Sequence, residues 1–566
     1  MSKEHHDPEL TVRTDPGATA PAPHAPPSAD AGLDAGPGLG PDADTGAINR
    51  PDRFLVLFGL ILVLAVVVWA LLWPGSFSSA SSAVLGEVLT NFDWLFVLAA
   101  DTFLVLAVWL VFSRFGRIRL GKDSDRPEFS RLAWIAMMFS AGMGIGLMFY
   151  GVGEPLQHYM DPGPGAEAIG QTTNAAQSAL EYSLFHWTLT PWAIYGVAAL
   201  ALAYSCFRKG RGNTMSAAFV PFIGERRARG WLGKVIDLLA VFATVFGTAT
   251  SLGIGTLQVA QGLDITTGIT QTEAVEMIII IALTAAFAAS AFSGLNKGVK
   301  WLSTLNVILA ALLMMFVFLF GPTTYILDTI PASVGGYLDN LIPMATRTDA
   351  FSDPSWMGSW TIFYWAWWIS WAPFVGTFIA RISKGRTIRE FLVGVLLVPS
   401  GATVVWFCVM GGTGLHLAEQ NVTAVVNSAS DAEASLFAVL DQLPFGAVTS
   451  VLAMILVMTY FITSADSASL VMGSLTSRGA LHPRRWLVVT WGLVMSTAAA
   501  ALLLAGGLDA LQSATIVVAL PFVLVLLGMC AALVRELRAD PAAGPGRRER
   551  ARARSQKEPV PGSGSV

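Results

Sequence analysis

The fold can be argued outward from one stretch of the sequence, WMGSWTIFYWAWWISWAPFVG, residues 356–376. These 21 residues include no charged side chain, and about 20 apolar residues suffice for a helix to cross a bilayer. Pro373 removes a backbone hydrogen-bond donor inside the stretch, and Gly376 loosens the following turn. The stretch therefore predicts a membrane-spanning helix that is interrupted near its middle.

The whole chain has the same apolar character. Of its 566 residues, 54% are apolar and 13% are charged, and the mean hydropathy is +0.59, whereas soluble proteins carry about 25% charged residues. One membrane anchor cannot account for this, so we expect a polytopic membrane protein. Cys206, Cys408 and Cys530 show neither disulfide nor zinc-site spacing. No basic patch indicates nucleic acid, and no catalytic motif indicates an enzyme.

Twelve apolar segments predict twelve transmembrane helices, at about 54–74, 92–113, 132–153, 179–207, 235–262, 275–293, 299–321, 356–380, 390–415, 446–473, 486–506 and 509–534. The distribution of basic residues supports this count, because Lys and Arg gather in the even-numbered connections and Arg347 alone lies in an odd-numbered one. We therefore expect a multi-pass protein of the plasma (inner) membrane with both termini in the cytoplasm.

Three parts of the chain differ in composition. Residues 1–52, rich in Pro, Ala, Gly and Asp, predict a disordered acidic cytoplasmic tail, and residues 53–535 form the transmembrane domain. Residues 536–566 form a basic cytoplasmic tail, which reflects either positive-inside bias or sensing of anionic lipids, at about 1 kcal/mol per basic residue. Between the seventh and eighth spans, the spacing of apolar residues over 325–343 predicts a helix in the outer interface.

A second interrupted span matches the first in position. The third span contains SAGMGIGLMFYG, residues 140–151, with four glycines in the middle of an apolar run. Counted from this span, spans 3–7 and 8–12 form two sets of five, and each set begins with an interrupted helix. Such pairs mark the binding sites of transporters built from inverted repeats, so we expect a five-plus-five inverted repeat. The alternative for the glycines is tight helix packing.

Aromatic side chains gather near mid-membrane on two spans. At about 100° per residue, Trp367, Trp371 and Phe374 share one face of the eighth span, and Trp368 lies next to them. The fourth span adds another group, Trp187, Trp192 and Tyr195. Ring faces attract a quaternary ammonium ion, which has no hydrogen-bond donor, by about 0.5–2 kcal/mol each. The two groups predict an aromatic box for such a cation, with a purely structural aromatic core as the alternative.

The segment from Ser359 to Glu390, SWTIFYWAWWISWAPFVGTFIARISKGRTIRE, resembles the hallmark of the betaine/choline/carnitine transporter family, most closely its sodium-coupled glycine betaine carriers. The resemblance extends over about residues 50–535 and includes TSADSAS, residues 463–469. It implies a LeuT-type fold of two inverted five-helix repeats, spans 3–7 and 8–12, preceded by two extra helices. It also implies a homotrimer and alternating access.

The resemblance also implies site residues. The aromatic box corresponds to Trp187, Trp192, Tyr195, Trp367, Trp368 and Trp371, and the broken helix that faces the substrate carboxylate to Gly142, Met143 and Gly144. One sodium site corresponds to Ser140, Met143, Tyr460, Thr463 and Ser464, and the other to Thr244, Thr248 and Phe374. No cofactor other than coupling sodium ions is implied. For a Thr pair in a span, bonding back to the carbonyl one turn earlier is the ordinary alternative.

The fifth span lacks a feature of the family's sodium-independent exchangers, which replace the ions with a basic side chain or a methionine. No Lys or Arg occurs between Lys234 and Lys297. We therefore expect sodium-coupled import of a quaternary ammonium compound, with glycine betaine favoured, in the service of osmoprotection. The alternative is a transporter of choline, carnitine or ectoine, coupled either to sodium or to protons, with or without osmosensing by the basic tail.

Several ionisable residues lie in or near the predicted spans, among them Asp101, Glu154, Glu181, His186 and Asp466. Charge inside a membrane is costly, so each is a functional candidate. We favour structural or gating roles for Glu154 and Asp466, and a role in helix packing for His186.

Overall fold

The computed structural model describes residues 50–142, 144–165, 168–293, 296–348, 350 and 354–544. Within these ranges the chain is helical, and its only β-type pairing is an isolated antiparallel bridge between Arg119 and Thr387. The predicted all-α class is confirmed. Most of both predicted tails lies outside the described residues.

The α-helices, in chain order, are α2 (Arg53–Leu72), α3 (Pro74–Phe112), α4 (Arg131–Gly142), α5 (Ile145–Met160), α6 (Thr173–Trp187), α7 (Leu189–Ala203), α8 (Val220–Ala228), α9 (Trp231–Thr267), α10 (Glu273–Ser293), α11 (Asn296–Phe320), α12 (Thr323–Ala345), α13 (Pro354–Met357), α14 (Phe363–Ile382), α15 (Ile388–Glu419), α16 (Thr423–Ser428), α17 (Ala432–Asp441), α18 (Gly446–Leu475) and α19 (Arg485–Ala539). Short 3-10 or π-helical segments are η1 (Arg114–Arg117), η2 (Tyr204–Arg208), η3 (Ser216–Phe219), η5 (Gly358–Ile362) and η6 (Pro541–Ala543).

Among the described residues, nine helical stretches are long and apolar enough to cross a membrane. The 55-residue α19 contains both the eleventh and the twelfth predicted spans, and its backbone departs from helical geometry at Gly506 and Gly507 between them. The third predicted span is divided between α4 and α5, each of which is too short to be counted alone. A polytopic membrane protein is therefore confirmed, and the count of twelve spans stays a prediction.

The third span is broken where its glycines predict. Helix α4 ends at Gly142 and α5 begins at Ile145, and the intervening Gly144 has an extended backbone. Met143 lies outside the described residues, and the side chain of Ser140 is likewise not described.

The predicted interruption of the eighth span is wrong. Helix α14 runs from Phe363 to Ile382 with Pro373 inside it, and the irregular π-helical turn η5 lies earlier, before the helix. A proline inside a helix costs about 3 kcal/mol because one hydrogen bond is lost and the ring meets the preceding turn. Most side chains of α14 are buried against α7, α9 and α19, and this packing holds the helix continuous through Pro373.

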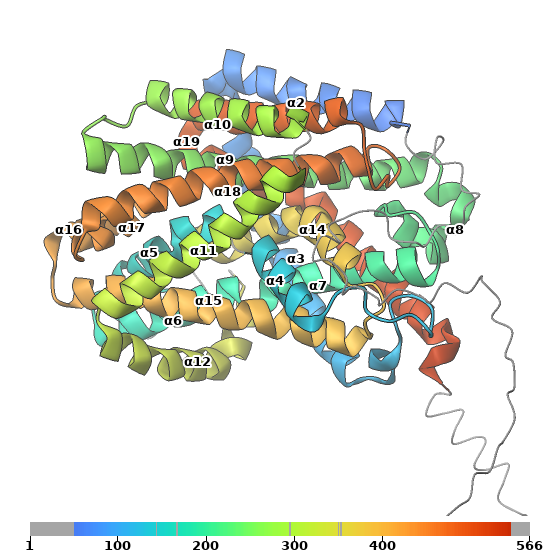
Figure 1. The fold of residues 1–566 in the computed structure, drawn as a ribbon, viewed down its shortest axis with the longest axis horizontal. Coiled ribbons are helices and arrows are strands. Elements are labelled where there is room, and N and C mark those ends of the chain that lie inside the picture. Colours follow the sequence, from blue (N-terminus) through green and yellow to red (C-terminus); the bar gives the residue numbers. More distant parts are fainter. Residues whose placement is uncertain are drawn as a thin grey trace, which may run out of the picture. The chain divides into compact units, whose positions relative to one another are not determined.

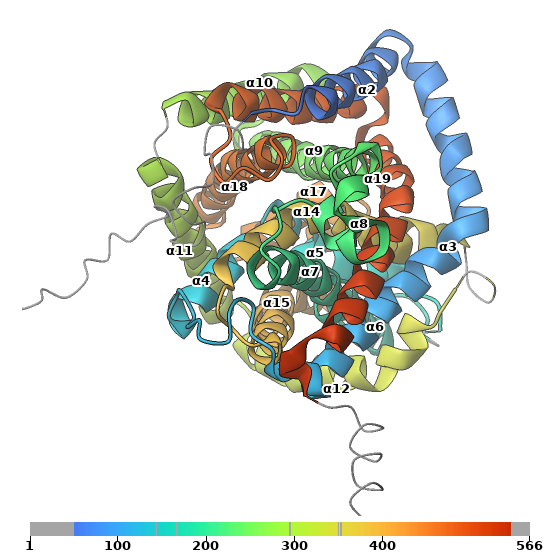
Figure 2. The same ribbon diagram turned by 90° about the vertical axis from the view of Figure 1, so that its right-hand side faces the viewer.

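The long helices surround a buried centre. Helices α2 and α10 both pack against α19 and α9, and they lie at the edge opposite α12 in both views (Figure 1 and Figure 2). Helix α12 packs against α6 and α15 and confirms the predicted helix over 325–343. Between these edges, α14 contacts α7 and α9, and α5 contacts α6, α9 and α15. The predicted aromatic groups on α6, α7 and α14 are thereby brought to one place.

Candidate functional site

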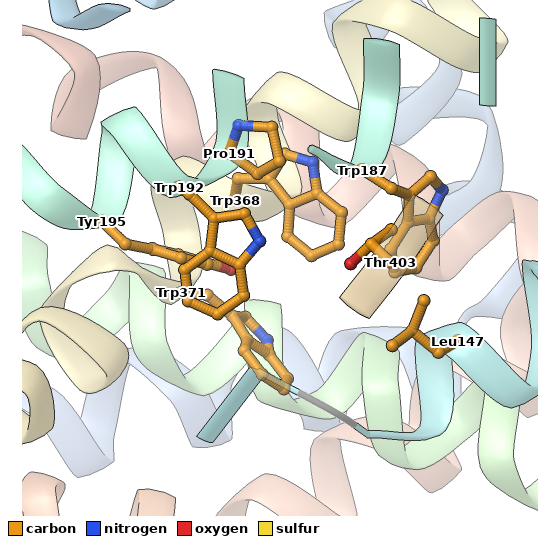
Figure 3. Close-up of a pocket in the computed structure, with 8 residues that line it drawn as sticks. All are labelled: Leu147, Trp187, Pro191, Trp192, Tyr195, Trp368, Trp371 and Thr403. Atoms are coloured by element: carbon orange, nitrogen blue, oxygen red, sulfur yellow. The ribbon is translucent and has the colours of Figure 1, made fainter. Parts of the chain in front are cut away.

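Five of the predicted box residues line one pocket in the interior. They are Trp187 on α6, Trp192 and Tyr195 on α7, and Trp368 and Trp371 on α14. The lining is completed by Leu147 of α5, Pro191 of α7 and Thr403 of α15. Figure 3 shows Trp192 and Tyr195 on one side of a common space, and Trp187, Thr403 and Leu147 on the other. Aromatic side chains from two regions of the chain therefore meet as predicted.

The rings are packed edge to face. The centroids of Trp187 and Trp368 lie 4.9 Å apart with the planes at 75°, and those of Trp192 and Tyr195 lie 5.7 Å apart at 79°. The ring centroids of Tyr195 and Trp368 lie 6.2 Å apart, with the planes at 79°. Trp187, Trp192, Tyr195 and Trp368 are each at most 6% exposed. A desolvated set of ring faces of this kind attracts a cation that carries no donor of its own.

Three of the indole N–H groups are held by protein acceptors. Trp187 donates its Nε1–H to the Glu154 carboxylate at 2.7 Å, and Trp368 donates to the His186 carbonyl at 3.0 Å. Trp371 donates to the Gly247 carbonyl of α9 at 2.8 Å. These bonds fix the orientation of each ring and leave its π-face, rather than its donor, for a ligand.

Trp367 lies behind the pocket instead of in its lining. Its ring stacks on Trp368 with centroids 4.9 Å apart and planes 13° apart, and its Nε1–H donates to the Gly247 carbonyl at 3.3 Å. A Cβ on Gly146 of α5 would lie only 2.8 Å from the Trp187 ring and 2.9 Å from the Trp367 ring. The absence of a side chain at position 146 therefore lets both rings pack against the α5 backbone.

The N-terminal end of α5 reaches the pocket. Leu147, in the first turn of this 16-residue helix, is part of the lining, and Gly144 precedes the helix as its N-cap. Backbone N–H groups in the first turn of a helix have no intrahelical partner and favour an anion. Of the predicted carboxylate-facing residues, Gly142 ends α4 and Gly144 precedes α5, while Met143 is not described.

The predicted sodium site at Thr244, Thr248 and Phe374 adjoins the pocket wall. Thr244 donates to the Ala240 carbonyl at 2.8 Å, the ordinary back-bond of a helical threonine, whereas the buried Thr248 hydroxyl has no hydrogen-bond partner among the described residues. The carbonyl of Gly247, the residue before Thr248, accepts the Trp371 Nε1–H. The Phe374 ring lies 5.5 Å from that of Trp371. The helix turn that carries Thr248 is thus fixed directly to the pocket.

The other predicted sodium site, which includes Thr463 and Ser464, lies only partly within the described residues. Thr463 donates to carbonyls of its own helix at Thr459 (3.0 Å) or Tyr460 (3.2 Å), and its oxygen accepts from the Asn306 amide at 3.2 Å. Ser464 is half-buried beside it. The described ranges leave out Met143 and the Ser140 side chain, so the meeting of α18 with the broken helix stays a prediction.

Sequence reasoning missed several residues at these sites. Thr403 supplies a hydroxyl to the pocket, and Asn306 places a buried amide beside Thr463 with its Oδ1 unpartnered within the described structure. A polar residue inside an apolar run was the only available signal for either one. Thr403 is distant along the chain from Trp187, and Asn306 from Thr463, and this separation hid their proximity.

Glu154 forms a fully buried polar cluster with two histidines next to the pocket. Its Oε1 lies 2.7 Å from His186 Nδ1 and 3.4 Å from His158 Nε2, and all three side chains are 0% exposed. Three such donor atoms within 4.8 Å are a set that metal ions use. Here, however, the other carboxylate oxygen already accepts from Trp187 and Tyr364. Glu154 and His186 are therefore part of a hydrogen-bond network connected to the pocket, while the ring nitrogens of His158 have no hydrogen-bond partner among the described residues.

Many apolar helices and a broken helix beside a buried pocket are features of a membrane transporter. The comparison of the sequence with known families names the group. The sequence model described as BCCT, betaine/carnitine/choline family transporter, matches residues 54–542, and the chain belongs to this family. Its members are transporters and not enzymes.

Relatives cover nearly the whole chain. The glycine betaine transporter OpuD of Bacillus subtilis is 45% identical over 481 residues, which is 84% of this chain and 93% of the relative. The betaine/ectoine transporter LcoP of Corynebacterium glutamicum is 41% identical, over 90% of this chain and 81% of its own length. The ectoine/hydroxyectoine transporter of Virgibacillus pantothenticus is 38% identical, over 87% of this chain and 97% of its own length.

Proposed function

We propose that this transporter imports glycine betaine by sodium symport and alternating access, in the service of osmoprotection. The observation that carries the proposal is the pocket in which Trp187, Trp368 and Trp371 present ring faces while their N–H groups are held elsewhere. A trimethylammonium group needs such a surface because it can be attracted but not hydrogen-bonded. The relative named a glycine betaine transporter, at 45% identity, supports this substrate.

The carboxylate of glycine betaine has a matching partner. The first turn of α5 lies at the pocket through Leu147, whose own N–H donates to the Gly144 carbonyl at 3.2 Å, and the positive end of the helix dipole there favours a negative group. Choline presents a neutral hydroxyl instead of a carboxylate and gains less from this helix end. A zwitterion with its cationic end among the rings and its carboxylate toward α5 fits both features.

Sodium coupling is supported by hydroxyl groups next to the pocket. Sodium is a hard cation that takes oxygen ligands, and Thr248 offers a buried hydroxyl that no other described group satisfies. At a membrane potential of about 100 mV, two sodium ions moving inward would supply about 4.6 kcal/mol. That energy supports accumulation of a neutral zwitterion on the order of a thousandfold.

Ectoine is the second candidate substrate. Two relatives at 38% and 41% identity are named as ectoine transporters. Ectoine, like glycine betaine, is a zwitterion with a cationic nitrogen centre and a carboxylate. The aromatic rings and the N-terminal end of α5 therefore match it as well. The proposed LeuT-type arrangement and the trimer rest on the family resemblance. The cytoplasmic position of both termini rests on the distribution of Lys and Arg, and lipid sensing by residues 536–566 rests on their basic composition.

Uptake into proteoliposomes tests the proposal. Radiolabelled glycine betaine should accumulate when an inward sodium gradient is imposed, and replacement of external sodium by potassium should reduce accumulation at least tenfold. Excess unlabelled choline and ectoine, added separately, measure the alternatives. Equal uptake with and without sodium would refute the coupling, and stronger competition by choline or ectoine than by glycine betaine would refute the substrate.

A further inference from the structure

We propose that Glu154 is a positioning residue of the aromatic pocket. It fixes the positions of Trp187 on α6 and Tyr364 on α14 relative to each other. The inference rests on the proposed function only in taking the pocket as the binding site for the substrate. Glu154 is placed on α5, the helix that follows the break in the third span, and is 0% exposed. Neither the aromatic box nor the two predicted sodium sites includes it.

One carboxylate oxygen joins the two helices. Glu154 Oε2 accepts the Trp187 Nε1–H at 2.7 Å and also accepts the Tyr364 hydroxyl. An indole N–H can only donate, so this oxygen is the acceptor on which the Trp187 ring depends. The rings of Trp187 and Tyr364 lie 5.5 Å apart, edge to face. Glu154 therefore sets the spacing between an α6 residue of the pocket and the aromatic stack of α14.

The other carboxylate oxygen of Glu154 connects, through His186, to Trp368 in the pocket lining. Glu154 Oε1 lies 2.7 Å from His186 Nδ1, and His186 Nε2 lies 3.0 Å from the Thr361 hydroxyl of η5. The backbone carbonyl of His186 accepts the Trp368 Nε1–H at 3.0 Å. The indoles of Trp187 and Trp368, which meet at 4.9 Å, are therefore both held by groups of this network.

The network explains why a charged side chain lies beside an aromatic pocket in the membrane. A buried carboxylate is tolerated when its oxygens are satisfied by donors, and here the donors are the side chains whose positions define the pocket. Loss of the carboxylate leaves the Trp187 N–H without its acceptor and releases the ring. Because the indole contributes its face to the cation, the release weakens binding rather than the later steps of transport.

Glu154→Leu tests the role, because leucine removes both acceptor oxygens, whereas glutamine would keep an amide oxygen that can still accept from Trp187. We expect its KM for the substrate to rise about tenfold, with the maximal rate of uptake within about threefold of the wild type. The matched control is Asp237→Asn, another buried acid on α9, whose carboxylate accepts from Ser216 and does not contact the pocket. Its KM should stay within about twofold of the wild type. An unchanged KM in Glu154→Leu, with the variant folded and active, would overturn the proposal.

A multiple-mutant comparison separates positioning from direct contact with substrate. In a Trp187→Phe/Tyr364→Phe background, both donors to Oε2 are absent, and adding Glu154→Leu should raise KM by less than about threefold, because only the His186 contact is left to lose. An undiminished tenfold rise in that background would mean that Glu154 does not act through Trp187 and Tyr364 and would overturn the proposal. The substrate used is the one that the wild type transports among glycine betaine, choline and ectoine. Failure of the proposed substrate is thus seen in the wild type alone, and failure of the positioning role only in the variants.

Discussion

The single polar atom of each tryptophan decides what the residue can do at the pocket. Trp187, Trp368 and Trp371 each donate to a protein acceptor, so their rings are fixed before any ligand arrives. A ligand then pays little for ordering these side chains, which raises the affinity that the ring faces can supply. The same logic applies to the threonines: Thr244 is satisfied by its own helix, and Thr248 is not.

Trp371→Leu should raise the KM for substrate about tenfold or more, since a desolvated cation–π contact is worth about 2 kcal/mol and about 1.4 kcal/mol corresponds to tenfold. The measurement is the concentration dependence of uptake in proteoliposomes. Trp301→Leu, a change at a 65% exposed residue of α11, is the control and should leave KM unaltered. An unaltered KM in Trp371→Leu would remove this residue from the binding surface.

Thr248→Val should lower the apparent affinity for sodium about tenfold and leave protein stability nearly unchanged, because the lost hydroxyl has no partner in the described structure. The sodium dependence of uptake at saturating substrate is the measurement. Thr256→Val in the same helix is a matched control, because the Thr256 hydroxyl is buried and bonds back to the Leu252 carbonyl at 2.9 Å. The prediction fails if both variants show the sodium dependence of the wild type.

At the scale of elements, α5 and α9 position the pocket through close backbone contacts. The α5 backbone at Gly146 meets the Trp187 and Trp367 rings, and the α9 backbone at Gly247 meets α14. A Cβ at position 247 would lie 2.9 Å from both Ser370 Cβ and Trp371 Cδ1. Both neighbours are on a buried helix that cannot withdraw without disturbing its other contacts.

Gly247→Ala should separate α9 from α14, break the Trp371 hydrogen bond to the Gly247 carbonyl, and reduce uptake of substrate about tenfold or more. Gly196→Ala in α7 is the matched control, because its Cβ would meet side chains at 3.4 Å or more, which is ordinary contact. Both variants are compared by uptake and by thermal denaturation of the purified protein. Equal uptake in the two variants would show that the α9–α14 contact does not determine the pocket.

At the scale of the whole described molecule, the end of α19 is tied to distant parts of the chain. Asp540, whose side chain is 1% exposed, accepts from Tyr204 at 2.7 Å and from Arg208 at 2.9 Å. Burial raises the pKa of Asp540, but the hydrogen bonds from Arg208, Tyr204 and the Ala542 backbone outweigh it and lower this pKa to about 2. The last helix is thereby fastened to η2, which directly follows α7, a helix of the pocket.

Asp540→Asn should lower the melting temperature at neutral pH, by the equivalent of about 1.5–3 kcal/mol for a charged hydrogen bond. Because the native pKa lies below the unfolded value near 3.8, the carboxylate stabilises the fold fully above about pH 4 and loses this effect as pH falls toward 2. The difference between variant and wild type should therefore shrink between pH 6 and pH 3. The control is Asp123→Asn, which changes a 73% exposed partner of Arg208 and should have little effect.

Local patterns predicted much of this molecule. Hydropathy marked the long helices, the glycine run marked the break between α4 and α5, and the spacing of Trp368 and Trp371 marked a wall of the pocket. Each of these properties depends on residues that are neighbours in the chain or on one helix face. The family, too, was recognised from a continuous segment and is confirmed over residues 54–542.

Other features depended on contacts between helices. The helix around Pro373 stays continuous because packing from three other helices outweighs the local cost of proline. Trp367 and Trp368 are adjacent in the chain, so their side chains point about 100° apart around the helix axis. The Trp367 ring packs against Gly146 and Trp368, and this packing decides that Trp367 lies behind the pocket. Sequence alone thus determined a polytopic helical protein with an aromatic motif, because hydropathy and helical spacing are local. Only tertiary structure decided which rings line the pocket and that Glu154 holds them, because those positions are set by residues distant in the chain.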